Sequence, residues 1–234
     1  MFKKLTLAIL MVSSACYADM PTIFRTDESA LSFYGVTNKI NKMKLSQINN
    51  KEKKNTVLML GDSITQGLNN NDLHFESVNL GIGGDTVHGL KARIKDIDTE
   101  NWKSVFIEIG TNNILMGENG IQLGEEISEL IDYASKNSKQ LFVSEVFIPN
   151  RSVVNGISED ASQANAILYK KCSEFNNCKI IKIPESMLIS GSLTSKYTIY
   201  DGIHLNGDAY SKWKVEINKS LAEFPYSLYY KYMK

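Results

Sequence analysis

The chain has 234 residues with 26 basic and 26 acidic side chains, so its formal charge at neutral pH is zero. This length suits one medium-sized domain whose core is large enough to fold without a disulfide framework or a structural metal. The balanced charge predicts neither a nucleic-acid footprint nor a polybasic patch for a membrane surface.

The N-terminus has the layout of a secretory signal peptide. Lys3 and Lys4 precede an apolar segment at 5–12 that is too short to span a bilayer, and small residues follow it. Cleavage after Ala18 is expected, although cleavage after Ala15 also satisfies the small-residue rule. The mature chain would then hold 24 basic and 26 acidic residues, be secreted or periplasmic, and carry no integral membrane segment.

Cys16 offers a second, less favoured interpretation of this segment, which is a lipid anchor. Ser13 stands three residues before it, where lipoprotein signals usually carry a bulky aliphatic residue. In an oxidising compartment, Cys172 and Cys178 are expected to form a small intrachain disulfide, with two free thiols as the alternative. Their spacing is not that of a redox motif or a zinc site.

Three regions are predicted: a signal peptide at 1–18, an N-terminal arm at 19–54, and a single domain at 55–234. Within the domain, short apolar runs predict strands, and apolar residues at intervals of three and four predict helices. The alternation predicts an α/β fold with a five-stranded parallel sheet covered by helices on both faces. The expected strands are 57–60, 77–80, 104–109, 140–148 and 179–183, and the expected helices are 87–97, 121–134, 162–175 and 207–221.

Three unusual turns follow directly after predicted strands. They contain Gly61-Asp62-Ser63, Gly83-Gly84-Asp85 and Gly110-Thr111-Asn112. Because the strands are parallel, their carboxyl ends lie on one rim of the sheet, where side chains can line a cleft. Taken alone, the first turn is typical of a helix cap. Its position also suits a nucleophilic serine.

A serine hydroxyl needs a base, usually an imidazole oriented by a carboxylate. The chain contains His74, His88 and His204, and the candidate base is His204, which has the carboxylate Asp201 three residues before it. This pair alone would more often be a cap or a core feature. Together with the strand-end Ser63, it predicts a catalytic Ser-His-Asp triad.

Acyl transfer also requires donors for the oxyanion that forms on attack. The backbone N–H of Gly84 can approach a substrate closely because glycine has no side chain. Asn112 can offer its amide NH₂ from the next strand end, and Ser63 can offer its own backbone N–H. Each of these turn residues could also be structural, so the prediction depends on their combination.

Four blocks in this order resemble the SGNH, or GDSL, hydrolase family over roughly residues 55–222. They are G-D-S-I from Gly61, N-L-G-I-G-G-D-T from Asn79, G-T-N-N from Gly110 and D-G-I-H-L-N from Asp201. The resemblance implies a flavodoxin-like three-layer α/β/α fold and an esterase that needs no metal or other cofactor. It implies the same roles for Ser63, Gly84, Asn112, Asp201 and His204.

Two positions depart from the commonest family pattern. Asn113 stands where an acid is frequent, and Ile64 stands where leucine is frequent. The G-T-N-N form resembles the subgroup similar to platelet-activating-factor acetylhydrolase catalytic subunits and bacterial acetylesterases. Asn113 therefore weakens the transfer of supporting roles around the site.

Other catalytic patterns fail at single positions. Thr86 interrupts a dinucleotide-binding fingerprint, and Thr65 replaces the last glycine of G-x-S-x-G. The expected function is an exported esterase that acts through an acyl-enzyme on short-chain (acetyl) esters of carbohydrates. A lysophospholipase is the alternative, and a catalytically weak glycan- or lipid-binding protein is a third possibility. The tyrosine-rich tail at 224–234 suggests either a sugar or membrane contact or packing on the sheet edge.

Overall fold

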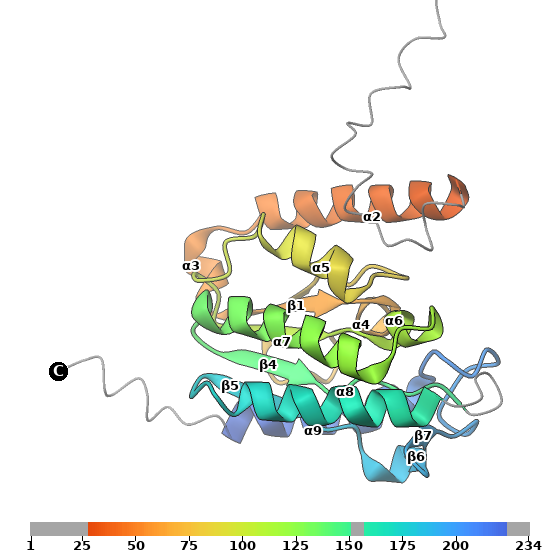
Figure 1. Ribbon diagram of the computed structural model, residues 1–234. Coiled ribbons are helices and arrows are strands. Elements are labelled where there is room, and N and C mark those ends of the chain that lie inside the picture. The colour runs from red at the N-terminus through yellow and green to blue at the C-terminus, as the bar shows by residue number, and fades with distance from the viewer. Residues whose placement is uncertain (1–27, 151–156, 224–234) are drawn as a thin grey trace, which may run out of the picture.

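The computed structural model describes residues 28–150 and 157–223 (Figure 1). Its centre is a five-stranded parallel sheet with the strand order β2-β1-β3-β4-β5. This is the flavodoxin-like order, and it confirms the predicted fold class. The strands are β1 (Thr56–Gly61), β2 (Glu76–Asn79), β3 (Ser104–Glu108), β4 (Leu141–Ser144) and β5 (Cys178–Ile181).

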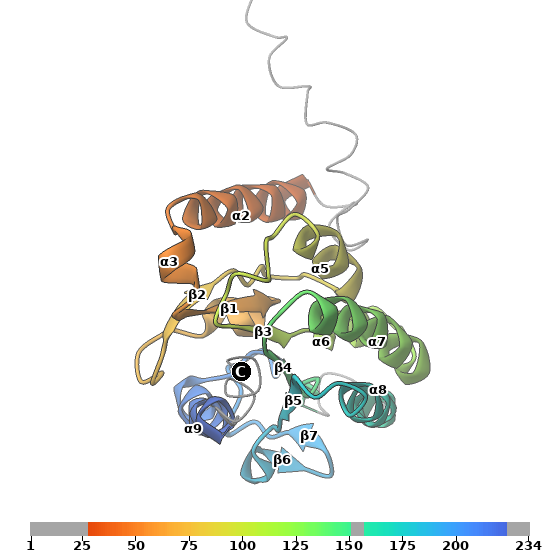
Figure 2. The same cartoon turned by 90° about the vertical axis from the view of Figure 1, so that its left-hand side faces the viewer.

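Helices cover both faces of this sheet (Figure 2). One face carries α5 (Val87–Ile94), α7 (Gly120–Lys136) and α8 (Ile157–Cys172), and the other carries α9 (Gly207–Glu223). Successive residues of a strand point to opposite faces, and β1 therefore supplies both cores. Leu58 and Leu60 enter the first core, whereas Val57 and Met59 enter the second.

Two helices precede the sheet in the region predicted as an arm. They are α2 (Glu28–Ser46) and the short α3 (Asn50–Lys53). Asn49 caps α3 through a capping box with Glu52. The Asn41 side chain donates to the Leu80 carbonyl oxygen at 3.0 Å, so α2 is fastened to the chain just beyond β2.

The fourth strand is shorter than predicted, because β4 ends at Ser144 instead of Ile148. Glu145 N makes the last bond to the neighbouring strand, at Ile181 O, and Val146 N then donates to Asn165 Oδ1 of α8. The following residues leave the sheet but stay buried. Their burial explains why the apolar pattern continued beyond the strand.

Several short elements were not predicted. Helices α4 (Ser63–Gly67) and α6 (Thr111–Leu115) begin at two of the strand-end turns. The 3₁₀ helix η2 (Glu185–Met187) leads into a small hairpin of β6 (Leu188–Ile189) and β7 (Ser192–Leu193). These elements are too short for a hydrophobic period to reveal them.

The predicted disulfide is present between Cys172, the last residue of α8, and Cys178, the first of β5. The predicted signal peptide, Cys16 and the tyrosine-rich tail lie outside the described residues. Within the described part of the chain, no helix is both long and apolar enough to cross a membrane.

Helices α7 and α8 pack closely because glycines face α8. A Cβ atom on Gly120 would lie 2.0 Å from the Asp160 carbonyl oxygen, and one on Gly124 would lie 2.6 Å from Ile167. Both distances are shorter than an atomic contact allows. The interface therefore depends on glycine at these positions.

We predict that Gly120→Ala lowers the free energy of unfolding by about 1–3 kcal/mol, because the new methyl group collides with backbone rather than with a mobile side chain. Gly207→Ala is the matched control, since Gly207 also begins a helix but has open space where its Cβ would lie. The control should change stability by less than about 1 kcal/mol. Urea denaturation of both variants measures the difference, and equal stabilities would contradict this account.

Candidate active site

The turn after β1 carries Ser63 at the carboxyl edge of the sheet. Gly61 ends the strand, and a Cβ there would lie 2.2 Å from the Glu108 carbonyl oxygen of β3. Glycine thus allows the two backbones to approach where the chain turns. Asp62 caps α4 by accepting a hydrogen bond from Ile64 N at 2.9 Å, as the simpler cap interpretation predicts.

The structure brings Ser63, Asp201 and His204 together although 141 positions separate Ser63 from His204. His204 Nε2 lies 2.8 Å from Ser63 Oγ, and His204 Nδ1 lies 2.5 Å from Asp201 Oδ2. Each ring nitrogen therefore has one partner. If Nδ1 carries the proton and donates it to the carboxylate, Nε2 is left to accept the serine proton.

Asp201 is held by its own turn as well as by the imidazole. Its Oδ1 accepts hydrogen bonds from Ile203 N at 2.9 Å and His204 N at 3.0 Å. Partial burial would raise the pKa of Asp201, but the bonds from the His204 ring and from these N–H groups outweigh burial and lower it. The carboxylate is therefore ionised at neutral pH and fixed in position.

The three predicted oxyanion donors also lie at strand ends. Neither Ser63 N–H nor Gly84 N–H donates to an acceptor within residues 28–150 and 157–223. Gly84 has φ +74°, a conformation that favours glycine. Asn112 Nδ2 donates to Asp85 O at 2.9 Å, and its other near acceptor is Asp62 Oδ2 at 3.4 Å. The amide is thus oriented, and its longer bond, to Asp62, is the one that a ligand oxygen could replace.

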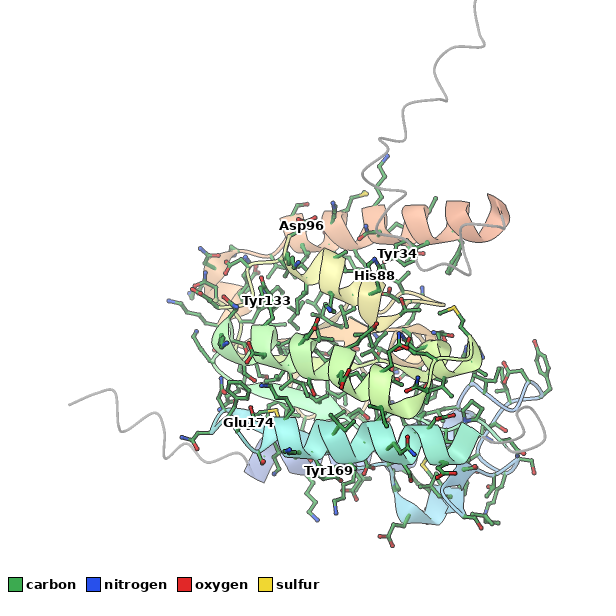
Figure 3. All side chains as sticks on the ribbon, in the orientation of Figure 1. Tyr34, His88, Asp96, Tyr133, Tyr169 and Glu174 are labelled. Atoms are coloured by element: carbon green, nitrogen blue, oxygen red, sulfur yellow. A yellow bond between two sulfur atoms is a disulfide. The ribbon has the colours of Figure 1, made fainter. Side chains whose placement is uncertain are left out.

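His74 and His88 take no part in this arrangement. His74 lies in the segment against α9, where its backbone N–H donates to Asn218 Oδ1 at 2.9 Å. His88 is exposed on α5, on the outer side of the helix layer (Figure 3). The choice of His204 from the three histidines therefore agrees with the geometry.

Two fully buried carboxyl groups, Asp62 and Glu108, lie beneath the turn, where each acts electrostatically on the other. Glu108 Oε2 also accepts from Thr65 N at 3.2 Å and Thr65 Oγ1 at 2.8 Å. Burial raises the pKa of Glu108 to about 7. Burial and the Glu108 charge raise the pKa of Asp62 well above its usual range. We infer that the pair retains one proton at neutral pH, because two adjacent buried charges would be costly.

A buried ion pair supports the oxyanion loop. Arg93 Nε of α5 donates to Asp85 Oδ2 at 2.7 Å. Its other nitrogens donate to Leu80 O at 3.0 Å and Gly61 O at 2.9 Å. Tyr34 of α2 reaches the second Asp85 oxygen at 3.3 Å. One guanidinium therefore ties the ends of β1 and β2 to the loop that carries Gly84.

Asn113, where the family often has an acid, acts as both donor and acceptor. Its Oδ1 accepts from Val87 N at 3.1 Å, and its Nδ2 donates to Glu118 Oε2 at 2.7 Å. An aspartate could not donate to a glutamate in this way. The departure from the commonest pattern is thus matched by a local partner and leaves Asn112 in place.

Sequence reasoning missed the supporting residues Glu108, Arg93 and Gln66. Glu108 gave a signal, since it is the only charged residue in the apolar run 105–109. Arg93 gave a weaker one, because it lies beside the apolar positions of the following helix. Gln66, whose Oε1 accepts from Gly83 N at 2.8 Å, gave none.

Residues 59–212 match the GDSL-like lipase/acylhydrolase family. The chain belongs to this family. It is therefore a carboxylic ester hydrolase of the GDSL type.

Among curated relatives, the platelet-activating factor acetylhydrolase IB subunit alpha2 of rat and of human is 26% identical to this GDSL hydrolase over 171 residues. The alignment covers 69% of this chain and 74% of either relative. Among solved structures, a GDSL-like lipase from Bacteroides thetaiotaomicron has a TM-score of 0.65 and 19% identity, covering 80% of this chain and 97% of that chain. A lipolytic G-D-S-L protein from Veillonella parvula has a TM-score of 0.60 and 18% identity, covering 72% and 98%. These structural likenesses support the fold.

The buried acid pair predicts a pH-dependent stability. The folded pKa of Glu108 lies above its unfolded value, so the favourable contribution is complete at low pH and is lost as pH rises through about 7. We expect the free energy of unfolding to fall on the order of 3 kcal/mol between about pH 4 and pH 8 from this pair. Urea denaturation at a series of pH values measures it.

Glu108→Gln should flatten this dependence, because its amide can donate to an ionised Asp62 while its carbonyl still accepts from Thr65. Glu76→Gln changes the formal charge equally at an exposed position and serves as the control. A Glu108→Gln variant that kept the wild-type pH dependence would show that the pair does not share a proton.

Proposed function

We propose that this GDSL hydrolase is exported and cleaves short-chain esters, acetyl esters of carbohydrates first among them, through an acyl-enzyme on Ser63. The observation that carries the catalytic part is the chain of contacts from Ser63 Oγ to His204 and from His204 to Asp201. The N-terminal sequence supports export, and the Cys172–Cys178 disulfide is consistent with an oxidising compartment.

The reaction follows from these atoms. His204 Nε2 takes the Ser63 proton as Oγ forms a bond to the ester carbonyl carbon. Ser63 N–H, Gly84 N–H and the Asn112 amide would donate to the oxyanion. As the carbonyl re-forms and the ester C–O bond breaks, His204 gives its proton to the departing alkoxide. Water, deprotonated by His204, then cleaves the acyl-enzyme and releases the acid.

Two observations support the substrate class. The curated relatives are named as acetylhydrolases, which favours a short acyl group. Tyr200, immediately before Asp201, has a fully exposed side chain that could stack on a sugar ring beside the site. The relatives' name also refers to platelet-activating factor, so a lipid ester is the second candidate.

The first test is the initial rate of hydrolysis of p-nitrophenyl esters from acetyl to palmitoyl by the chain lacking residues 1–18. We expect activity to be greatest with acetyl and propionyl esters and to be lost in Ser63→Ala, whose thermal unfolding should match the wild type. A maximum at long acyl chains would favour the lipid-ester alternative. Wild-type turnover by Ser63→Ala would show that the nucleophile is another residue.

Asp201→Asn tests how the imidazole is oriented. An amide NH₂ in place of Oδ2 would face His204 Nδ1 as a donor and favour the tautomer that carries its proton on Nε2, which cannot accept from Ser63. We predict a decrease in kcat on the order of 10⁴-fold with little change in KM. Asp208→Asn, at an exposed position on α9, is the control and should keep wild-type kinetics. A loss in kcat of less than tenfold for Asp201→Asn would contradict the assigned role.

A further inference from the structure

Helix α2 exposes its more apolar side to solvent. Phe33, Val36, Ile40 and Met43 are 49, 54, 46 and 56% exposed, and they account for four of the ten large hydrophobic residues that are exposed in the described part of the chain. Their spacing of three, four and three residues places them along one face of the helix. We call these four residues the α2 stripe.

The opposite side of α2 packs on the protein mainly through polar groups. Tyr34 reaches Asp85, Asn41 reaches Leu80 O, and Thr37 is buried between them along the helix. Figure 3 shows Tyr34 on the side of α2 that faces α5. Packing within the chain therefore explains the inner face and leaves the α2 stripe unexplained, and an exposed apolar face of this kind commonly marks an interaction surface.

Lysines flank the α2 stripe, and no acidic residue occurs between positions 33 and 51. Lys42 Nζ lies 3.7 Å from Asp96 in an exposed pair, and Lys44 Nζ donates to the Asn79 carbonyl oxygen. Lys39 forms no ion pair with any described residue. The zero overall charge, which predicted no basic patch, conceals this local excess of positive charge.

The charge distribution distinguishes between possible partners. A two-fold contact with a second copy would bring the lysines of both copies into one interface, because each subunit uses the same patch. An anionic lipid surface complements both features of the helix, since its acyl region accepts the α2 stripe and its headgroups attract the lysines.

The α2 stripe begins beside the candidate active site. A Cβ on Gly83 would lie 3.2 Å from Phe33 Cε1, and Gly83 is next to the oxyanion donor Gly84. A groove of about 600 Å³ continues from Phe33 between α2 and the segment after α4, with Val36 and Leu68 in its lining. A surface that contacts α2 would therefore lie close to the turn that bears Ser63.

We propose that the exposed face of α2 docks this protein on an anionic lipid surface, so that the Ser63 site meets esters carried at that surface. The docking step depends only on the α2 stripe and its lysines. The presentation of esters to Ser63 rests on the proposed function. The docking step does not depend on the preferred acyl-chain length, because α2 would contact the lipid surface and not the acyl group of the substrate.

Co-sedimentation with vesicles tests the docking step. The chain lacking residues 1–18 is used, because the apolar segment among those residues would itself bind lipid. This shortened chain keeps all the described residues. Vesicles of phosphatidylglycerol and phosphatidylcholine in equal parts are compared with phosphatidylcholine alone. We expect binding to the mixed vesicles to be at least tenfold stronger, and to weaken about fivefold in Lys39→Gln but not in the exposed Lys139→Gln.

The double variant Ile40→Ser/Met43→Ser should reduce binding at least tenfold, whereas Ile121→Ser, at a 56% exposed position on α7, should not. Thermal unfolding checks that the double variant is folded. Ser63→Ala should bind vesicles as the wild type does, so docking and catalysis can fail independently. No binding to anionic vesicles, equal binding by the double variant, or an α2-dependent dimer in sedimentation without lipid would each overturn the proposal.

Discussion

The Arg93 guanidinium holds the active-site rim together. It binds Asp85 through an ion pair and donates to the carbonyl oxygens of Gly61 and Leu80, which lie at the ends of two neighbouring strands. Charge-assisted bonds of this kind are strong, and a buried arginine with all these partners avoids the large cost of an unpaired buried charge. The positions of Ser63 and Gly84 both depend on this one side chain, although it contacts neither.

The same network accounts for the polar inner face of α2. Asp85 has an oxygen that faces Tyr34, and Leu80 O accepts from Asn41, so the inner side of α2 must present polar groups to satisfy buried acceptors. Apolar residues on the outer side add nothing to this packing. The site and the polar inner face of α2 are therefore two consequences of one arrangement of buried polar groups.

The sequence predicted the strands and the site because their signals are local. The strand at Leu58 and Met59 is an uninterrupted apolar run, because neighbouring residues of a strand buried on both faces enter opposite cores. Ser63, Gly84 and Asn112 each follow a strand of a parallel sheet, where topology alone brings their turns to one edge. The end of β4 could not be predicted, since Asn165 of α8 takes over Val146 N only after the chain has folded. The Asp62–Glu108 pair was missed for a similar reason. Asp62 does cap α4, and nothing in its neighbouring residues indicates a second buried carboxyl 46 positions away.

Buried polar groups cluster at the carboxyl edge of the sheet. They are exceptions to the general rule that such groups are rare in protein cores. Glu108 stands in β3 at a buried position that would suit an apolar residue. It accepts hydrogen bonds from the backbone N–H and the hydroxyl of Thr65, and it thereby fixes the first turn of α4 directly after Ser63. A hydrophobic residue there would pack well but could not hold that turn. By contrast, Tyr200 and the α2 stripe lie outside the sheet and bear no bond of the catalytic network. The sheet edge thus constrains the chemistry, while the surrounding loops and α2 are free to determine which esters reach it.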